Sequence, residues 1–317
     1  MIVTVTMNPA IDKTVDIGKF EHGGLNRIKN VEIDAGGKGI NVSKTIKELG
    51  GETIATGFIG GTTGQLIENV LNEMGIKNDF VKIESPTRTN TKLVEEGGIV
   101  TELNEPGPVI TEEAMKEILA KLEGYASEET LFVLAGSVPA SVDKGIYGKI
   151  ADAVHKKGAK VFIDADGELF VKSLDSKPDY IKPNNIELAE FFGVEGDITI
   201  EDTVGMAEKL MARGIEHIAV SMGKDGAVFV SNEEKFKCKG LKVKAHSTVG
   251  AGDAMVAAIS YGVEKGLSYR EAAKLGVATS AGAVTTIGTK PPTREVVDEL
   301  LAQVKCEEIY HINNKKL

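Results

Sequence analysis

Ser247-Thr-Val-Gly-Ala-Gly-Asp-Ala254 leads directly into the apolar segment 255–262, and this stretch carries the most information about the fold. Gly250 and Gly252 allow the backbone to curl, so that successive N–H groups can point at one anion. Asp253 then lies in the first turn of the predicted helix, where the helix dipole alone favours an acidic residue. It could equally accept a proton from a hydroxyl beside a transferred phosphoryl group, and position alone leaves both interpretations open. The stretch lacks the third glycine of a dinucleotide-binding fingerprint.

A second glycine cluster, Gly36-Gly-Lys-Gly-Ile-Asn-Val-Ser43, precedes another amphipathic segment. Glycines before a helix let the backbone approach a ligand, and the start of the helix offers unpaired N–H groups. Lys38 would add a positive charge suited to a phosphate. Because Gly-Lys is followed by glycine and not by Ser or Thr, the cluster is not a Walker A loop. A tight strand-to-helix turn with a solvent-exposed lysine explains the same residues about equally well.

Two further motifs lie between these clusters. In Lys182-Pro-Asn-Asn-Ile-Glu187, Asn184 and Glu187 have the spacing of a helix capping box. Alternatively, they help to hold hydrated Mg²⁺ near nucleotide phosphates, because Mg²⁺ keeps most of its water in proteins. Ser221-Met-Gly-Lys-Asp-Gly226 follows an apolar run and by itself predicts only a β-turn.

Around these motifs, short β-branched runs alternate with amphipathic helical patterns. The runs 131–135 and 217–221 are almost continuously apolar, as strands buried on both faces are. This alternation predicts an α/β fold with a mainly parallel central sheet and helices on both faces. Residues 12–34 and 86–104 contain short strand-like pieces and no helical pattern, which predicts a small second sheet that forms a lid. No Pro/Ser-rich linker divides the chain, so we expect residues 1–317 to form a single domain.

The composition excludes several classes of protein. With 37 Lys and Arg against 47 Asp and Glu, the 317-residue chain has a formal net charge of −10 and no basic block. It is therefore a poor match for a nucleic-acid backbone or an anionic membrane, although local cations could still bind small phosphorylated ligands. No run reaches about 18 apolar residues, and no basic leader opens the sequence, so we expect no membrane contact and a cytoplasmic location. Cys238 and Cys306 are too few for a disulfide framework or a cysteine-based zinc site.

In their order along the chain, the four motifs resemble those of the ribokinase-like (PfkB) carbohydrate kinase family. Residues 36–42 are similar to the early family signature and residues 248–253 to the late one. The resemblance extends over about residues 1–305 and implies a three-layer α/β/α fold with a small β-sheet lid.

Within this family the chain looks most like the branch that contains 1-phosphofructokinases and tagatose-6-phosphate kinases. The start Thr4-Val-Thr-Met-Asn-Pro-Ala-Ile-Asp12, the pair Asn26-Arg27 and the lysine of the early signature carry that likeness. Ser247 stands where many members of the wider family have Asp, so the resemblance does not extend to a monovalent-cation site.

The resemblance implies that the γ-phosphoryl group of ATP is transferred to a primary hydroxyl of a phosphorylated ketose. Asp253 would be the catalytic base, and the N–H groups of Gly250, Ala251 and Gly252 would form the anion hole. The implied substrate-binding residues are Asp12, Arg27, Gly36, Gly37, Lys38, Asn41, Arg88 and Asp253. The implied nucleotide-binding residues are Lys182, Asn184, Ser221, Gly223, Lys224, Asp225, Gly226, Thr248, Gly250 and Gly252. Glu187 would hold Mg²⁺ through water.

The leading hypothesis is therefore a kinase that converts D-fructose 1-phosphate and ATP to D-fructose 1,6-bisphosphate and ADP. Tagatose 6-phosphate is the nearest rival acceptor, and fructose 6-phosphate follows it. A non-catalytic sugar-phosphate or nucleotide sensor is the alternative from another class, and the missing fingerprint disfavours a dehydrogenase. The expected partners are the small-molecule phosphosugar and ATP, and the resemblance also implies a homodimer formed through the lid.

Overall fold

The computed structural model describes residues 1–196 and 198–309, and a large sheet runs through its centre. From one edge to the other, its strands are β15 (Cys306–Glu308), β14 (Lys235–Cys238), β13 (Ala227–Ser231), β12 (His217–Ser221), β11 (Tyr180–Ile181), β10 (Lys160–Asp164), β9 (Leu131–Ala135), β1 (Ile2–Thr6), β4 (Thr53–Gly60) and β5 (Lys77–Asn78), with β6 (Val81–Ile83) also paired to β4. All neighbours from β12 to β5 pair in parallel, whereas β12, β13, β14 and β15 form antiparallel pairs. The mainly parallel sheet predicted from the sequence is confirmed.

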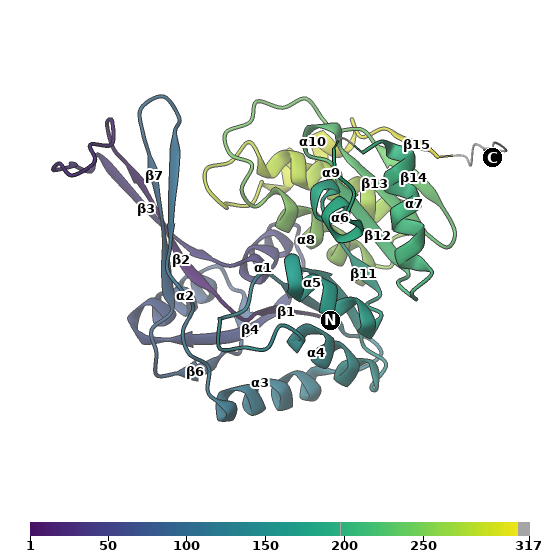
Figure 1. The fold of residues 1–317 in the computed structure, drawn as a ribbon, viewed down its shortest axis with the longest axis horizontal. Coiled ribbons are helices and arrows are strands. Elements are labelled where there is room, and N and C mark those ends of the chain that lie inside the picture. The colour runs from purple at the N-terminus through teal and green to yellow at the C-terminus, as the bar shows by residue number, and fades with distance from the viewer. Residues whose placement is uncertain (197, 310–317) are drawn as a thin grey trace.

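Helices cover both faces of this sheet (Figure 1). One face packs against α3 (Glu112–Tyr125), α4 (Ile146–His155), α5 (Gly167–Ser173), α6 (Asn185–Phe192) and α7 (Ile200–Met211). The other face packs against α1 (Lys38–Glu48), α8 (Ala251–Glu264) and α9 (Tyr269–Ala283), with α10 (Arg294–Leu301) behind them. A further helix, α2 (Gly61–Glu73), packs beside β4. The alternation of side chains along each strand supplies both apolar faces, which gives the three-layer arrangement.

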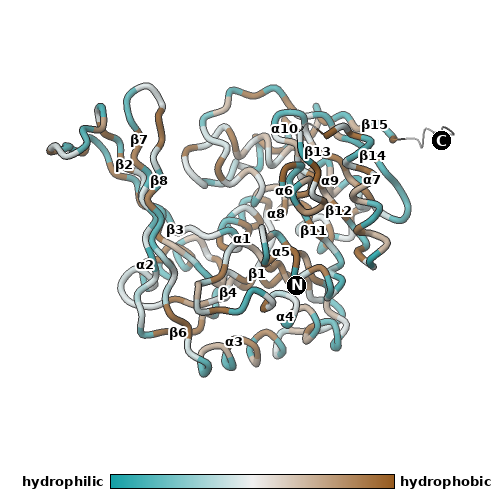
Figure 2. The backbone as a smooth tube through the Cα atoms, viewed as in Figure 1, coloured by the Kyte–Doolittle hydropathy of each residue, from teal (hydrophilic) through white to brown (hydrophobic). Residues whose placement is uncertain are grey.

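A second, four-stranded sheet projects from the body (Figure 1). Its order is β3 (Asn30–Gly36), β2 (Ala10–Asp16), β7 (Arg88–Val94) and β8 (Val100–Asn104). The strands β2 and β7 pair in parallel, and the two outer pairs are antiparallel. Hydrophobic and hydrophilic stretches both occur along this sheet (Figure 2), because its residues alternate between two unlike faces. The small second sheet predicted from the sequence is confirmed.

The edge of the large sheet holds a feature that the sequence did not predict. Cys238 and Cys306 lie directly opposite each other on β14 and β15, and they form a disulfide across this antiparallel pair. Their Cα atoms are 4.0 Å apart. The two cysteines are thus a single local crosslink between strands that are 68 residues apart in sequence. None of the helices in the described part of the chain is long and apolar enough to cross a membrane.

Candidate active site

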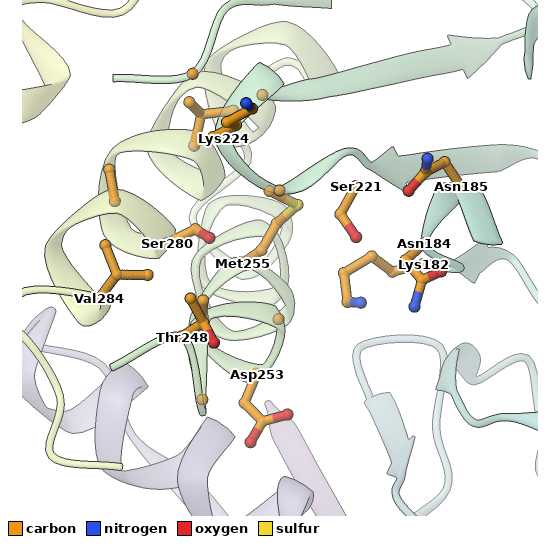
Figure 3. Close-up of a pocket in the computed structure, with 18 of the residues that line it drawn as sticks. Lys182, Asn184, Asn185, Ser221, Lys224, Thr248, Asp253, Met255, Ser280 and Val284 are labelled. Carbon is orange, nitrogen blue, oxygen red and sulfur yellow. The ribbon is translucent and has the colours of Figure 1, made fainter. Parts of the chain in front are cut away.

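The carboxyl ends of the parallel strands meet at one edge of the large sheet, where open α/β folds bind their ligands. A cavity of about 620 Å³ lies at this edge, a size typical of sites for small molecules. The residues that line it are Lys38, Asp164, Lys182, Asn184, Asn185, Ile186, Glu187, Ser221, Gly223, Lys224, Gly226, Gly240, Leu241, Val243, Ala245, Thr248, Gly250, Ala251, Gly252, Asp253, Met255, Val277, Ser280, Ala281 and Val284. Figure 3 shows Asp253 at one end of this cavity and Lys224 at the other. Most of the nucleotide-site residues predicted from three separate motifs therefore surround one space, and Lys38 of the fourth motif lines it too.

The helix α8 begins at this cavity. Gly250 precedes its first residue with φ 83°, a left-handed conformation that glycine adopts without strain. The N–H of Ala251 donates to the Thr248 carbonyl at 3.4 Å, so one of the three predicted anion-hole donors has an internal partner. The N–H groups of Gly250 and Gly252 have no backbone acceptor within residues 1–196 and 198–309. The start of α8 can therefore receive an anion.

Asp253 is buried in the first turn of α8, with 7% of its surface exposed. Its Oδ2 accepts a hydrogen bond of 2.8 Å from the Asn41 side chain, which belongs to the predicted sugar-binding motif. Burial, and after it the negative charge of Asp164, raises the pKa of Asp253 to about 6. A carboxylate with this pKa is ionised near neutral pH and is also a stronger base than an ordinary aspartate.

The helix α1 begins at the same place from the opposite side. Gly37 precedes it with φ 112°, and a side chain at Gly36 would displace the Asp12 carboxylate, which lies against the position of a Cβ atom there. The N–H of Asn41 bonds to the Gly37 carbonyl at 2.9 Å. Lys38, the first residue of the helix, lines the large cavity. The two predicted glycine loops thus face each other across Asn41 and Asp253.

The small sheet carries several of the residues that were predicted to bind the sugar. Asp12 on β2 pairs in register with Asn90 on β7, and the Asn90 amide donates to Asp12 Oδ1 at 3.2 Å. The Arg88 guanidinium donates to the carbonyls of Asn8 and Glu105 at 3.3 and 3.2 Å. Burial raises the pKa of Asp12, although Lys92 and the Asn90 hydrogen bond oppose the rise. A cavity of about 50 Å³ adjoins Asp12, between the small sheet and residues 287–290.

Unpaired polar atoms gather on this side. Asn8 Oδ1, Asn41 Oδ1, Arg88 Nε and Asn90 Oδ1 are buried and have no hydrogen-bond partner among the described residues. Buried polar atoms usually have partners, and each unpaired one therefore needs an explanation. A polar ligand such as a sugar phosphate would provide those partners.

The capping box predicted for Asn184 and Glu187 is confirmed, at the part of the cavity where we expect the nucleotide. Asn184 and Glu187 form a complete capping box at the start of α6, with side-chain hydrogen bonds of 2.8 Å in both directions. Both residues also line the cavity, so capping and ligand binding are compatible. Gly226 has no space for a side chain because the Cys238 carbonyl lies directly against the Cβ position.

Two predicted site residues, Asp225 and Arg27, line neither cavity and make none of the site contacts described above. Asp225 lies in the short 3₁₀ turn Gly223–Asp225 but not in the cavity lining, and Arg27 is exposed on the small sheet's connecting loop. Asp164 and Asn90 were not among the predicted site residues. Asp164 ends the buried strand β10, and its position at the carboxyl end of a parallel strand was the available signal.

Asp164 forms ion pairs with two lysines of the site, Lys38 and Lys182. Its Oδ1 lies 3.3 Å from Lys182 Nζ and 3.6 Å from Lys38 Nζ, and only 2% of its side chain is exposed. Burial alone would raise the pKa of Asp164, but Lys182 and Lys38 lower it below its ordinary value. The Asp164 charge in turn raises the pKa of Lys38, so that the ammonium group stays protonated.

A buried aspartate at a helix start, two facing glycine loops and a lysine-lined cavity are the features expected of a small-molecule kinase with a ribokinase-like fold. The model of the pfkB family of carbohydrate kinases matches residues 5–295, and the chain belongs to this family.

Three similar proteins illustrate the family's range. The chain is 39% identical over 309 residues to the 1-phosphofructokinase of Bacillus subtilis, covering 98% of this chain and 100% of that protein. It is 33% identical over 311 residues to the D-tagatose-1-phosphate kinase of Bacillus licheniformis, with 98% and 100% covered. The solved tetrameric inhibited form of Escherichia coli phosphofructokinase-2 superposes with a TM-score of 0.89 at 26% identity, covering 95% of this chain and 98% of that chain.

Proposed function

We propose that this chain transfers the γ-phosphoryl group of ATP to the C6 hydroxyl of D-fructose 1-phosphate, giving D-fructose 1,6-bisphosphate and ADP. The observation that carries the proposal is the position of Asp253, buried between the large cavity and the Asn41 side chain, with a pKa of about 6. Among similar proteins, a 1-phosphofructokinase matches over nearly the whole chain.

In the proposed reaction, Asp253 Oδ accepts the proton of the sugar hydroxyl as the oxygen attacks the γ-phosphorus. The bond from the γ-phosphorus to the bridging oxygen breaks, and ADP leaves with that electron pair. The free N–H groups at the start of α8 and the ammonium groups of Lys38 and Lys182 stabilise the negative charge on the transferred group. An anion-hole donor of this kind contributes about 3 kcal/mol.

The donors at the nucleotide side suit Mg²⁺ held largely through water. Glu187 and Asn184 line the cavity, but the capping box already uses the single side-chain oxygen of Asn184 and one of the two oxygens of Glu187. The described residues contain no cluster of three or more acidic, histidine or cysteine side chains that could enclose a metal ion. Mg²⁺ commonly binds with few protein ligands and retained water, so Glu187 fits as a ligand through water. When bound beside the phosphates, Mg²⁺ would neutralise part of their charge.

We assign the sugar-binding role to the side that carries the unpaired polar atoms. Asp12 would accept hydrogen bonds from sugar hydroxyls, with Asn90 and Gly36 beside it, and Gly37 and Asn41 would contribute from the start of α1. Arg88 would bind the phosphate already on the sugar, because guanidinium groups match phosphate oxygens in geometry and charge.

The nucleotide phosphates would lie along Lys182, Ser221, Gly223, Lys224, Gly226 and Thr248. Asp225 would contribute only through the conformation of its turn, since it lies outside the cavity lining.

The small sheet fits the role of a lid within a single kinase domain that spans the chain. One of its faces carries Asp12, Asp34 and Asn90, which are neighbours in register and turn towards the site. The other face exposes Val31, Ile33 and Leu103, at 40%, 57% and 55% exposure.

A second copy of the chain would cover this apolar face, giving a homodimer through the lid. Arg27, which is exposed on the same sheet, would then contribute only near that interface. We place the dimer in the cytoplasm, where its substrates would be found. Analytical ultracentrifugation of the wild type and Ile33→Glu should detect a dimer that this substitution weakens. A monomeric wild type would contradict the proposed interface.

The substrate is tested by coupling ADP release to a readout with Mg-ATP and each sugar phosphate in turn. We expect the highest kcat/KM with D-fructose 1-phosphate. D-Tagatose 1-phosphate is the second candidate, because a relative that is 33% identical over nearly the full chain is a D-tagatose-1-phosphate kinase. Tagatose 6-phosphate and fructose 6-phosphate complete the set, and binding without ADP release for every sugar would favour a non-catalytic sensor.

A further inference from the structure

Asp164 joins two cations that come from distant parts of the chain. Lys38 is the first residue of α1, on the sugar side, whereas Lys182 follows β11, on the nucleotide side. Both ammonium groups lie within 3.6 Å of the same oxygen, Oδ1 of Asp164. Two ammonium groups held this close repel each other, and the carboxylate between them offsets that repulsion.

The surroundings show where the two ammonium groups are held. The Lys38 side chain packs over Gly136, which has φ 89°, and its Cβ lies 3.4 Å from the position of a Cβ on that glycine. The Gly136 N–H donates to the backbone carbonyl of Asp164 at 2.9 Å, so the support of Lys38 is attached to β10. Lys182 Nζ lies 3.3 Å from the Cβ position of Gly252, directly against the start of α8.

We propose that Asp164 is a positioning residue that holds the ammonium groups of Lys38 and Lys182 together beside Asp253, on the path of the transferred phosphoryl group. This inference rests on the proposed kinase function. Asp164 itself touches neither substrate in this arrangement and acts through the two lysines. Lys38 and Lys182 would then contact the phosphoryl group from the acceptor side and the donor side.

The energetics of the buried carboxylate support a functional role. Asp164 Oδ2 is buried and has no hydrogen-bond partner among the described residues. An unpaired buried carboxylate oxygen destabilises the fold, so stability alone does not explain its presence. Asp253 is faced by Asp164 from β10, by Lys38 and Asn41 from α1 and by Lys182 after β11. Of these groups, only Asp164 raises the pKa of the base.

The main test is Asp164→Asn, which keeps the shape of the side chain and removes its charge. We expect kcat to fall by about tenfold to a hundredfold, because misplaced cations no longer match the transition state. The acidic limb of the pH profile of kcat/KM should also move to lower pH, because the base loses a neighbouring negative charge. A lower folded fraction would reduce the rate but leave this limb in place.

Asp166→Asn is the matched control, since Asp166 is exposed, lies two residues further along and forms no ion pair with either lysine among the described residues. It should leave both kcat and the limb close to the wild type. An unchanged limb in Asp164→Asn, or an equal shift in Asp166→Asn, would overturn the proposal.

If Asp164→Asn folds poorly, Lys182→Met and the double variant Asp164→Asn/Lys182→Met provide a second test. The double variant removes one negative and one positive charge, which restores the charge balance. Loss of Asp164 should cost less in kcat/KM when Lys182 is already absent, and strictly multiplicative effects would contradict the inference.

A last measurement separates this inference from the substrate assignment. Acetylation of Lys38 by acetic anhydride across pH, followed by mass spectrometry, reports the proton affinity of its amine without turnover. Asp164→Asn should shift this profile to lower pH, and Asp166→Asn should shift it far less. An unchanged profile would overturn the positioning role, whereas an inactive wild type with the expected shift would refute only the proposed kinase function.

Discussion

Asn41 and Asp253 are 212 residues apart in the chain, yet the Asn41 amide donates a 2.8 Å hydrogen bond to Oδ2 of Asp253. The two side chains come from the first turns of α1 and α8, which begin at the two glycine loops. This bond therefore fixes the proposed base relative to the proposed sugar-binding loop. It also stabilises the ionised form of Asp253, against the effect of burial.

Asp253→Asn should reduce kcat by at least about a hundredfold, because a neutral amide cannot accept the proton of the sugar hydroxyl. Binding of the sugar phosphate should remain, since the amide keeps the shape and the hydrogen-bonding capacity of the side chain. Steady-state kinetics and calorimetric titration with the sugar phosphate measure the two effects. Nearly normal turnover in this variant would show that Asp253 is not the base.

The pH dependence follows from the pKa of about 6 of Asp253. The base must be ionised, so kcat/KM should fall as the pH drops through this value. Asn41→Ala removes a hydrogen bond that lowers this pKa, and the acidic limb should therefore move to higher pH. Asn90→Ala, which removes a contact to Asp12 instead, should change KM without moving the limb. A limb at the same pH in all three proteins would contradict the role of Asn41.

Arg88→Met should raise KM for the sugar phosphate by about tenfold or more and change KM for ATP little. The reason is that Arg88 is oriented by the carbonyls of Asn8 and Glu105 and retains an unpaired Nε. Arg213→Met is a matched control, because Arg213 pairs with the exposed Asp175 on the molecular surface. Equal changes in both KM values would show that Arg88 does not face the sugar phosphate.

The local parts of this architecture were predictable from sequence. The strands 131–135 and 217–221 have the predicted bounds, because a continuous apolar run between turns is a local signal. The glycine loops were also found, since their backbone conformations depend on the residues themselves. The edge strands β14 and β15 were missed, because strands of four and three residues form only when their partner is in place.

The site shows the same division between local and non-local features. The cavity residues predicted from the motifs line one space, because each motif follows the carboxyl end of a strand or opens a helix. The convergence of Lys38 and Lys182 on Asp164 was not predictable, because it depends on the order in which β10 and β11 lie in the sheet. Nothing in the local sequence distinguishes Asp164 from other aspartates that follow an apolar strand.

Lys44 offers a test of stability that is separate from catalysis. Its ammonium is buried, with 2% of the side chain exposed, and it donates to Asp34 Oδ2 and the Ala35 carbonyl at 2.9 Å each. Asp34→Ala would leave this ammonium without its counter-ion and should lower the free energy of unfolding by about 3 kcal/mol. Urea unfolding followed by circular dichroism measures the change.

The matched control is Glu52→Ala, which removes the partner of Lys77 in a pair that is exposed on both sides. Exposed pairs stabilise proteins little, so this variant should unfold close to the wild type. Similar losses in both variants would show that burial of Lys44 does not make its ion pair important.

The disulfide between Cys238 and Cys306 gives the last prediction. It closes a chain segment of 68 residues, and in the chain-entropy description such a loop stabilises the folded state by about 4 kcal/mol. Cys306→Ser should therefore unfold at lower urea concentration than the oxidised wild type. The reduced wild type should unfold together with the variant, because both lack the crosslink.

Disulfides are uncommon in the cytoplasm, so intact-mass measurement of freshly isolated protein should first establish how much of it is oxidised. Identical unfolding of oxidised and reduced wild type would show that the crosslink contributes nothing to stability. Since Cys238 also packs its carbonyl against Gly226 in the cavity wall, KM for ATP should be measured alongside, and we expect it to rise on reduction.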